Sequence, residues 1–357
     1  MTPSVAGNNK KPAAPTPLVK VTKANSEQPL PAADAESLRQ FDSNNLLRPT
    51  DHVDPATRAN PAKPNLLTED VKLHHLSPYL GTEVSGVQLS NLSKEGLDEL
   101  ALFVAERKLV VFRDQDLKDV DFEAQIELTR HFGVPHIHPV PMSVPGYPEI
   151  FSLYKVSNRP NVASYLSQGR INYLSWHSDV SYEKQPAGTT FFYVLDGPEV
   201  GGDTLFLSTV EAYERLSPAF KELLVGLKAV HTSAPFEKVS SMPGAAKLRR
   251  DPVATEHPII RVHPVTGEKS IYVNATFTSH IVGFKKEESD ALLNFLYDHI
   301  GKGADFHVRA TYRPGTVVVW DNRVTAHTVV ADYDKNIRRH HIRLTPQAEK
   351  PIPATEI

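Results

Sequence analysis

The chain has 357 residues, enough for one large domain or two modest ones. Its 39 basic and 42 acidic residues nearly balance, so its charge gives no reason to expect nucleic acid as a partner. Cysteine is absent, which excludes a disulfide framework, a thiolate metal site and a cysteine nucleophile, and leaves His, Asp and Glu as the candidate metal ligands. The sequence shows neither a secretory signal nor an apolar run of membrane length, so we expect a cytoplasmic protein without a membrane partner.

Residues 1–65 are expected to form a disordered, proline-rich N-terminal tail. They hold 10 of the 29 prolines and one aromatic residue, Phe41, so they offer too little apolar surface to offset the entropy lost on ordering. A His-x-Asp pair, His52 and Asp54, falls in this segment and is expected to be solvated. We therefore expect the protein to work without residues 1–60.

The ordered domain is expected to span residues 66–357 and to begin with two helices around a strand. Residues 94–108 carry apolar side chains at helical spacing, and Ser93 is the candidate N-cap of that helix. The run "LVVF" at 109–112 predicts a short buried strand. The run "VDFEAQIELTRHFG" at 120–133 predicts a second amphipathic helix.

From about residue 170 the sequence changes to short β-rich runs that are separated by turns. Helical inserts are expected at roughly 209–228 and 286–300. Many short strands with a few outer helices predict a mainly β fold with flanking helices, a double-stranded β-helix (jelly roll), rather than a doubly wound sheet. The predicted strands are 189–196, 204–208, 258–264, 269–274 and 316–320.

The run "LSWHSDVSY" at 174–182 contains the first candidate for a metal site. If it forms a strand, His177 and Asp179 point to the same face, close enough to bind one metal ion. His327, which follows the β-rich run at 316–320, is a candidate for the third ligand. Two histidines and one carboxylate match the facial triad of non-haem Fe(II) oxygenases, which leaves coordination positions for substrates. Two surface polar residues and one core histidine are the alternative that spacing alone leaves open.

The run "RRHHIRLTP" at 338–346 predicts a strand with an unusual face. A period of two puts Arg339, His341 and Arg343 on that face and leaves His340 exposed on the other. Two arginines on one face of a buried strand are costly unless each meets an anion. On an edge strand they would simply be solvated.

The stretch "HIHP" offers a rival metal site. His136 and His138 would share the face of a strand, as in a cupin. They lack the acidic residue and the glycine-rich lead-in expected of a cupin, so this interpretation has less support.

Several motifs together resemble the taurine dioxygenase family of Fe(II)- and 2-oxoglutarate-dependent oxygenases. They are "WHSDVSY", "GGDTLFLSTVEAYERLS" and "WDNRVTAH", with two arginines downstream. The N-terminal stretches "LGTEVSGVQLSNLS", "LVVFRDQDL" and "HFGVPHIHPV" agree in order and spacing. The resemblance covers roughly residues 73–346 and implies a jelly-roll dioxygenase domain with helical inserts.

The resemblance implies an iron centre with three protein ligands, His177, Asp179 and His327. It assigns the distal carboxylate of the co-substrate 2-oxoglutarate to Arg339 and Thr204. Arg338 is the alternative to Arg339, because the spacing from His327 is one residue longer than the family pattern. Oxidative decarboxylation of 2-oxoglutarate by O2, giving succinate and CO2, would be coupled to hydroxylation of the substrate, with no general acid or base required.

The resemblance also implies an anionic substrate, with sulfonates such as taurine first. In sulfonate-oxidising relatives the second histidine of "HIHP" and the last arginine contact the sulfonate, and their counterparts here are His138 and Arg343. Two departures from the family pattern, Pro141 and Tyr173, predict a different pocket around the far end of the substrate. The expected substrate-binding positions are His138, Tyr173, Val180 and Arg343.

Three alternatives remain open at this point. The same chemistry could act on a carboxylate or amino acid, a sulfate ester or a secondary metabolite. A jelly-roll protein could bind its ligand without turnover, although the intact triad argues against this. A zinc hydrolase could use the same ligands, but it would have no use for Arg339. The resemblance also raises the expectation of a homo-oligomer.

Overall fold

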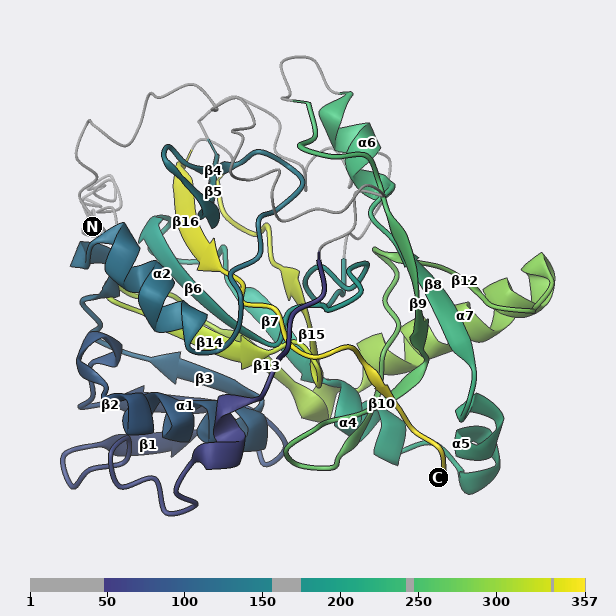
Figure 1. The fold of residues 1–357 in the computed structure, drawn as a ribbon, viewed down its shortest axis with the longest axis horizontal. Helices are drawn as coiled ribbons and strands as arrows, with labels where there is room; N and C mark the ends of the chain where they lie inside the picture. Colours follow the sequence, from purple (N-terminus) through teal and green to yellow (C-terminus); the bar gives the residue numbers. More distant parts are fainter. Residues whose placement is uncertain (1–47, 156–174, 242–246, 335–336, 357) are drawn as a thin grey trace, which may run out of the picture.

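The computed structural model describes residues 48–155, 175–241, 247–334 and 337–356. The expected tail therefore lies mostly outside the described residues, as does Tyr173. Between them, the described residues form the predicted mainly β fold (Figure 1).

The largest element is an eight-stranded sheet. It is antiparallel except where β2 and β3 run parallel. In spatial order its strands are β1 (Lys72–His75), β2 (Thr82–Ser85), β3 (Leu109–Phe112), β14 (Val317–Asp321), β6 (Thr189–Asp196), β16 (Arg339–Leu344), β5 (Tyr147–Lys155) and β4 (Ser143–Val144).

A three-stranded antiparallel sheet packs against the inner face of the large one. Phe206 on its central strand lies 5.2 Å from the ring of Trp320, centroid to centroid, and Val308 joins the same buried cluster as Val318. Two sheets that share one apolar core make the jelly roll, as predicted. The small sheet has the order β13 (His307–Ala310), β7 (Thr204–Ser208) and β15 (Thr325–Val329).

Helices α1 (Lys94–Arg107) and α2 (Phe122–Arg130) cover the outer face of the large sheet (Figure 1). The alternation along β14 explains this layering, because Val317 and Val319 pack in the helix-side cluster whereas Val318 and Trp320 face the small sheet. The predicted N-cap is confirmed, since the hydroxyl of Ser93 accepts a hydrogen bond from the Gly96 N–H.

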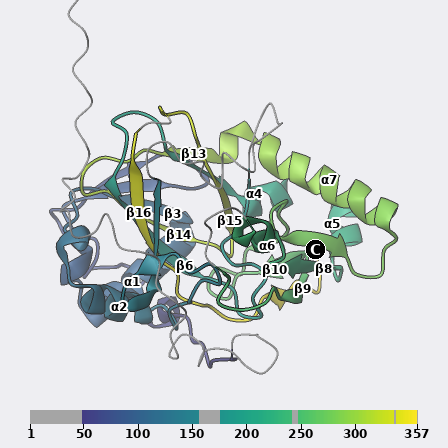
Figure 2. The ribbon, with the colours of Figure 1, turned by 90° about the horizontal axis from the view of Figure 1, so that it is seen from above.

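A second group of elements lies beside the jelly roll (Figure 2). The insert predicted over 209–228 proves to be two short helices that meet at Ser217, and the insert predicted over 286–300 is one helix. The helices are α4 (Thr209–Glu214), α5 (Pro218–Leu224), α6 (Pro235–Ser240) and α7 (Lys286–Lys302). The strands are β8 (Lys228–Thr232), β9 (Ala254–Pro258), β10 (Ile260–Val262), β11 (Lys269–Ile271), β12 (Thr278–Ile281) and β17 (Ile352–Pro353).

The expected domain boundary at residue 66 differs from the structure. Residues 48–65 lie against the domain, and Pro55–Arg58 forms a 3-10 helix whose N-cap is Asp54. Asp54 is 7% exposed and contacts the buried Arg323, so it is not solvated as expected. The composition of this segment is poor in apolar residues, but buried ion pairs and backbone hydrogen bonds hold it in place.

No helix in the described part of the chain is both long and apolar enough to cross a membrane.

Candidate metal centre

His177 and His327 are joined through their backbones. The His177 N–H donates to the His327 carbonyl at 3.0 Å, and the His327 N–H donates to the His177 carbonyl at 2.9 Å. This antiparallel bridge ties the segment before Asp179 to strand β15. The two imidazole rings therefore lie side by side, with centroids 4.2 Å apart.

Asp179 lies in a turn and not in the strand that its alternation predicts. The Asp179 N–H donates to the side-chain Oδ1 of Asn322 at 2.9 Å instead of to a neighbouring strand, and Val180 has a φ of 46°. A β-branched residue rarely adopts positive φ, so no strand pattern could reveal this turn. The turn still brings the carboxylate beside both histidines.

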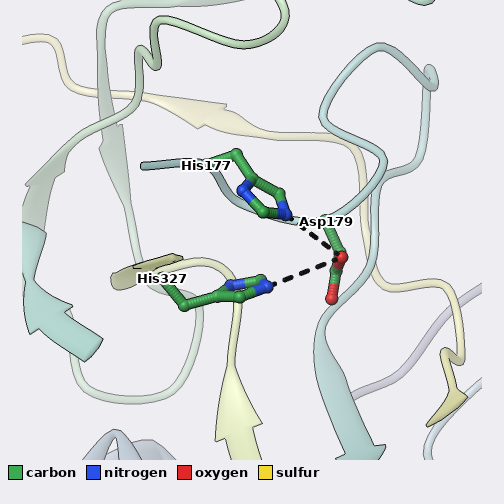
Figure 3. A group of neighbouring side chains, drawn as sticks. All are labelled: His177, Asp179 and His327. Atoms are coloured by element: carbon green, nitrogen blue, oxygen red, sulfur yellow. Dashed lines mark ion pairs between the residues drawn. The ribbon is translucent and has the colours of Figure 1, made fainter. Parts of the chain in front are cut away.

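The three side chains converge as a single donor set (Figure 3). The Nε2 atoms of His177 and His327 each lie 3.9 Å from the Oδ1 of Asp179, and the candidate ligand atoms are all within 4.8 Å of one another. In the described residues this is the one group of three or more His, Cys, Asp or Glu that meets this spacing. Two imidazoles and one carboxylate fit Fe(II), as the sequence predicts.

Hydrogen bonding and burial leave these groups in the forms that bind metals. The Nδ1 of His177 is 2.6 Å from the Ser175 carbonyl, so Nδ1 carries the proton and Nε2 keeps its lone pair. Burial, aided by His177, lowers the pKa of His327 to about 3, which keeps its ring neutral.

The carboxylate of Asp179 stays ionised although it is only 2% exposed. Burial is the largest single influence and alone would raise its pKa, but the positive groups around it, the Arg343 guanidinium first among them, together outweigh burial and lower the pKa. Its Oδ2 atom has no hydrogen-bond partner among the described residues. A buried, charged and half-satisfied carboxylate is what a cation would complete.

Arg339 is the first residue of β16, an inner strand of the large sheet, and is 5% exposed. Its Nη1 donates to the Nδ1 of His341 and its Nη2 donates to the Gly202 carbonyl, each at 3.0 Å. Among the described residues it has no carboxylate partner, so a buried positive charge lacks its counter-ion. Thr204 is near this region, with its hydroxyl 2.7 Å from that of Tyr312, whose ring centroid lies 5.9 Å from the Arg339 guanidinium.

The neighbouring Arg338 turns the other way. Its Nε lies 3.4 Å from the Oδ2 of Asp196, and its side chain is more exposed than that of Arg339.

The prediction that His340 is exposed is wrong. His340 is 3% exposed, because strand β5 covers it and the hydroxyl of Ser152 lies 2.9 Å from its Nε2.

Three of the predicted substrate residues, Arg343, His138 and Val180, are described by the structure, and they lie around Asp179 and the ring of Phe151. Arg343 lies over the ring of Phe151 at 4.8 Å, and His138 lies 4.5 Å from the same ring. The Nδ1 of His138 accepts the Val140 N–H, which leaves a proton on Nε2. Val180 is buried beside Asp179.

Two aromatic residues that no sequence motif identifies, Phe236 and Phe277, lie near His138 and His177. Phe236 on α6 lies 5.1 Å from the His138 ring, Phe277 lies 5.9 Å from the His177 ring, and the two phenylalanines are 5.6 Å apart. They form an apolar wall from His138 to the donor set. Neither belongs to a recognisable motif, and they come from segments far apart in the chain, so no local signal identifies them.

The rival pair of His136 and His138 does not form a metal site. The Nε2 of His136 is 2.9 Å from the carboxylate of the buried Glu183, which also contacts Arg250. The two histidine rings lie edge to face, 6.2 Å apart. His136 therefore belongs to a charged network behind the turn at Asp179.

Known proteins are similar to this chain in sequence and in fold. The chain matches the family model "Taurine catabolism dioxygenase TauD, TfdA family" over residues 72–345. It is 48% identical over 307 residues to the "Alpha-ketoglutarate-dependent dioxygenase cnsP" of Penicillium expansum, and the aligned part covers 85% of this chain and 82% of the relative. It is 38% identical over 346 residues to an "Alpha-ketoglutarate-dependent sulfonate dioxygenase" of Saccharomyces cerevisiae, and the aligned part covers 95% of this chain and 83% of the relative. The solved structure of a taurine dioxygenase from Burkholderia xenovorans is similar, with a TM-score of 0.63, 30% identity, and coverage of 80% of this chain and 93% of that one.

Proposed function

The chain belongs to the TauD/TfdA family and is thus an Fe(II)- and 2-oxoglutarate-dependent dioxygenase, and from that premise we propose that it hydroxylates an anionic small molecule, with sulfonates first. The observation that carries the assignment of its site is the convergence of three donor side chains, His177, Asp179 and His327. We propose these three residues as the ligands of the iron.

The protein supplies positions and charges, and the bound groups supply the redox chemistry. When bound, Fe(II) supplies the O2 chemistry that converts 2-oxoglutarate to succinate and CO2 and hydroxylates a C–H bond. Asp179 provides the negative charge of the donor set, and the carbonyl of Ser175 fixes the tautomer of His177. The aromatic rings of Phe206 and Trp320 pack around His327 and exclude water from its inner side.

Arg339 is proposed to bind the distal carboxylate of 2-oxoglutarate. Its planar guanidinium suits a carboxylate, and it is buried beside the hydroxyls of Thr204 and Tyr312. Arg338 is a poorer candidate, because it pairs with Asp196. His341 accepts one N–H of Arg339 and so orients the fork.

Arg343 and His138 are proposed to bind the anionic head of the substrate. Arg343 touches Asp179 through one nitrogen, and its Nε has no hydrogen-bond partner among the described residues, so donors remain for an anion. The protonated Nε2 of His138 offers a further donor. The relative from Saccharomyces cerevisiae is named a sulfonate dioxygenase, which favours a sulfonate over a carboxylate.

If the substrate is a sulfonate, the products follow from the position of attack. Hydroxylation of the carbon beside sulfur gives a 1-hydroxysulfonate, whose C–S bond breaks as the hydroxyl loses its proton. The products are an aldehyde and sulfite. The wall of Phe236 and Phe277 favours a substrate with an apolar body, which keeps sulfate esters and secondary metabolites as the second candidates.

The test is an aerobic incubation with Fe(II), 2-oxoglutarate and either taurine or an alkyl- or arylsulfonate, with succinate and sulfite assayed together. Equal amounts of succinate and sulfite support the sulfonate proposal. Substrate-dependent succinate without sulfite redirects the search to sulfate esters, carboxylates and secondary metabolites. The Asp179→Ala variant is the control for non-enzymatic oxidation.

The proposal also includes a cytoplasmic location and a homo-oligomeric state. Light scattering of the purified protein tests the second, and fractionation of cells that express a tagged copy tests the first.

A further inference from the structure

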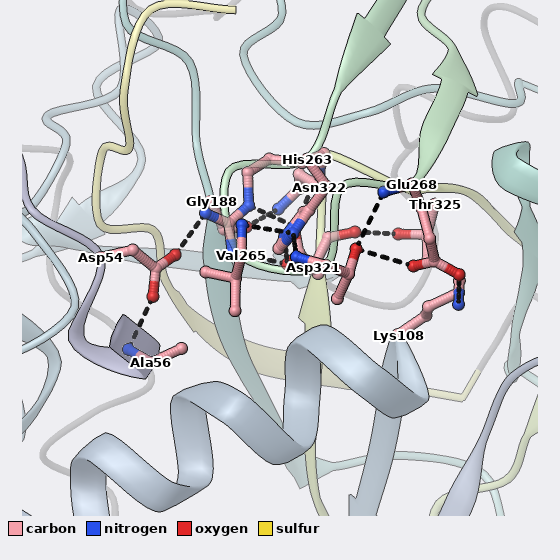
Figure 4. Close-up of polar contacts among 12 residues, drawn as sticks. Asp54, Ala56, Lys108, Gly188, His263, Val265, Glu268, Asp321, Asn322 and Thr325 are labelled. Atoms are coloured by element: carbon pink, nitrogen blue, oxygen red, sulfur yellow. Dashed lines mark hydrogen bonds and ion pairs between the residues drawn. The ribbon is translucent and has the colours of Figure 1, made fainter. Parts of the chain in front are cut away.

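Residues 50–58, which we call the N-terminal strap, lie against the domain, and Figure 4 shows Asp54 and Ala56 of this strap beside the polar group that includes Asp321 and Asn322. The strap includes Asp54 and the 3-10 helix Pro55–Arg58. Asp54 caps that helix, since its Oδ1 accepts the Ala56 N–H at 2.8 Å. Its other oxygen contacts the guanidinium of Arg323, a residue 269 positions later in the chain.

The first attachment point of the strap is the turn between β14 and β15. Arg323 is 2% exposed, and its Nε and Nη2 donate to the two carboxylate oxygens of Asp321 at 2.8 and 2.7 Å. Its Nη1 contacts Asp54 and, at 3.3 Å, Glu349. Buried charged groups need close hydrogen-bond partners, and loss of Asp54 would leave the Nη1 of Arg323 with only its longer, 3.3 Å contact to Glu349.

The second attachment point is the loop that follows Asp179. The Thr50 N–H donates to the Oε1 of Gln185 at 2.8 Å, and the Nε2 of Gln185 donates to the Thr50 carbonyl at 2.9 Å. Gln185 is six residues after Asp179 in the sequence. The strap therefore contacts both segments that carry candidate metal ligands, the loop around Asp179 and the turn that leads into His327.

These two segments meet at Asn322, between Asp321 and Arg323. The Oδ1 of Asn322 accepts the Asp179 N–H at 2.9 Å, and its Nδ2 donates to the Gly188 carbonyl at 3.0 Å. A shift of the turn at Arg323 would thus move the backbone of Asp179. The path from the strap to the carboxylate runs through Arg323 and Asn322.

We propose that the N-terminal strap holds the two ligand-bearing segments in register, and that Asp54 and Gln185 are positioning residues for the metal centre. This inference rests on the proposed metal site. It predicts that loosening the strap weakens metal binding more than an equal loss of stability elsewhere does.

A purely stabilising role is the competing explanation, and a matched variant separates the two. The buried Arg113 forms an ion pair with the half-buried Glu83 and donates to the Thr311 carbonyl, and these residues lie outside the ligand-bearing segments. Arg113→Met therefore destabilises the fold without touching the strap. Removal of residues 1–47 is a second control, since it leaves the strap intact, whereas removal of residues 1–60 deletes it. Because Thr50 and Asp54 contact both ligand-bearing segments, the expectation from composition that the protein works without residues 1–60 is replaced by the opposite one.

The experiment measures Co(II) binding by calorimetry and by the visible absorption of the bound ion, together with the thermal unfolding of each metal-free protein. We expect Asp54→Asn and the 1–60 deletion to weaken Co(II) binding about tenfold and to change its spectrum, as substitutions behind metal ligands do. Gln185→Leu serves if Asp54→Asn does not fold, and we expect it to weaken binding in the same direction. The 1–47 deletion and Arg113→Met should bind Co(II) like the wild type.

Three results would overturn the inference. Unchanged Co(II) affinity in Asp54→Asn and in the 1–60 deletion would remove the role of the strap. An equal loss of affinity in Arg113→Met at the same loss of melting temperature would show that stability alone sets metal binding. Failure of the wild type to bind Co(II) would overturn the proposed metal site itself, which is a separate outcome.

Discussion

We propose that Arg339, and not Arg338, binds the distal carboxylate of 2-oxoglutarate, and paired alanine variants can test this proposal. Arg339 donates one N–H to the Nδ1 of His341 and one to the carbonyl of Gly202. A guanidinium has five N–H donors, so three remain for a carboxylate. Loss of a charge-assisted hydrogen bond costs about 1.5–3 kcal/mol, which corresponds to a rise of about 10- to 150-fold in the KM for 2-oxoglutarate.

The assay is succinate formation across a titration of 2-oxoglutarate at saturating substrate. Arg339→Ala should raise the KM for 2-oxoglutarate by that factor, whereas Arg338→Ala should leave it within about twofold, because Arg338 pairs with Asp196 near the surface. Metal affinity, measured with Co(II), should be the same in both variants. A raised KM in Arg338→Ala with an unchanged KM in Arg339→Ala would refute the reasoning.

Other predictions address the donor set, its support and its surroundings. Asp179→Ala should abolish both Co(II) binding and succinate formation, because two imidazoles alone hold the ion poorly; an active variant would end the triad hypothesis. Asn322→Ala should lower the free energy of unfolding in urea by at least about 1–3 kcal/mol, the cost of one unsatisfied buried group, since Asn322 bonds Asp179, Trp320, Gly188 and Thr190. Burial lowers the pKa of His257 to about 4. Between pH 6.5 and 4 the unfolded chain therefore binds a proton that the folded chain does not, and the free energy of unfolding falls as the pH falls through this range. His257→Gln should make that decline shallower in thermal unfolding at a series of pH values, and an identical slope would contradict this assignment.

Local patterns in the sequence predict much of the fold. The strands at 189–196 and 204–208 match β6 and β7, and the strand at 316–320 differs from β14 by one residue at each end. These strands are recognisable because their β-branched and aromatic residues are dense and their boundaries carry turn residues. The strand β1, whose four residues are all exposed, has no such pattern and was not predicted.

The candidate site could be predicted in part, through the order and spacing of its motifs. The convergence of His177, Asp179 and His327 matches the prediction, although the strand assumed for the first two is wrong. The positive φ of Val180 is a conformational choice that the surrounding structure imposes. The contact of Asp54 with Arg323 joins residues 269 positions apart, and a segment poor in apolar residues gives no sign of it.

The backbone bridge between His177 and His327 holds the two side chains close together before any metal ion binds. The amide groups of the bridge pair with each other whenever the chain folds, so the entropy of bringing two distant histidines together is lost during folding and not during metal binding. An ion at the proposed site would therefore meet two nitrogen donors that are already side by side. Asp179, on its separate turn, is the proposed ligand whose placement can differ, and we expect small changes there to alter metal preference without rebuilding the barrel.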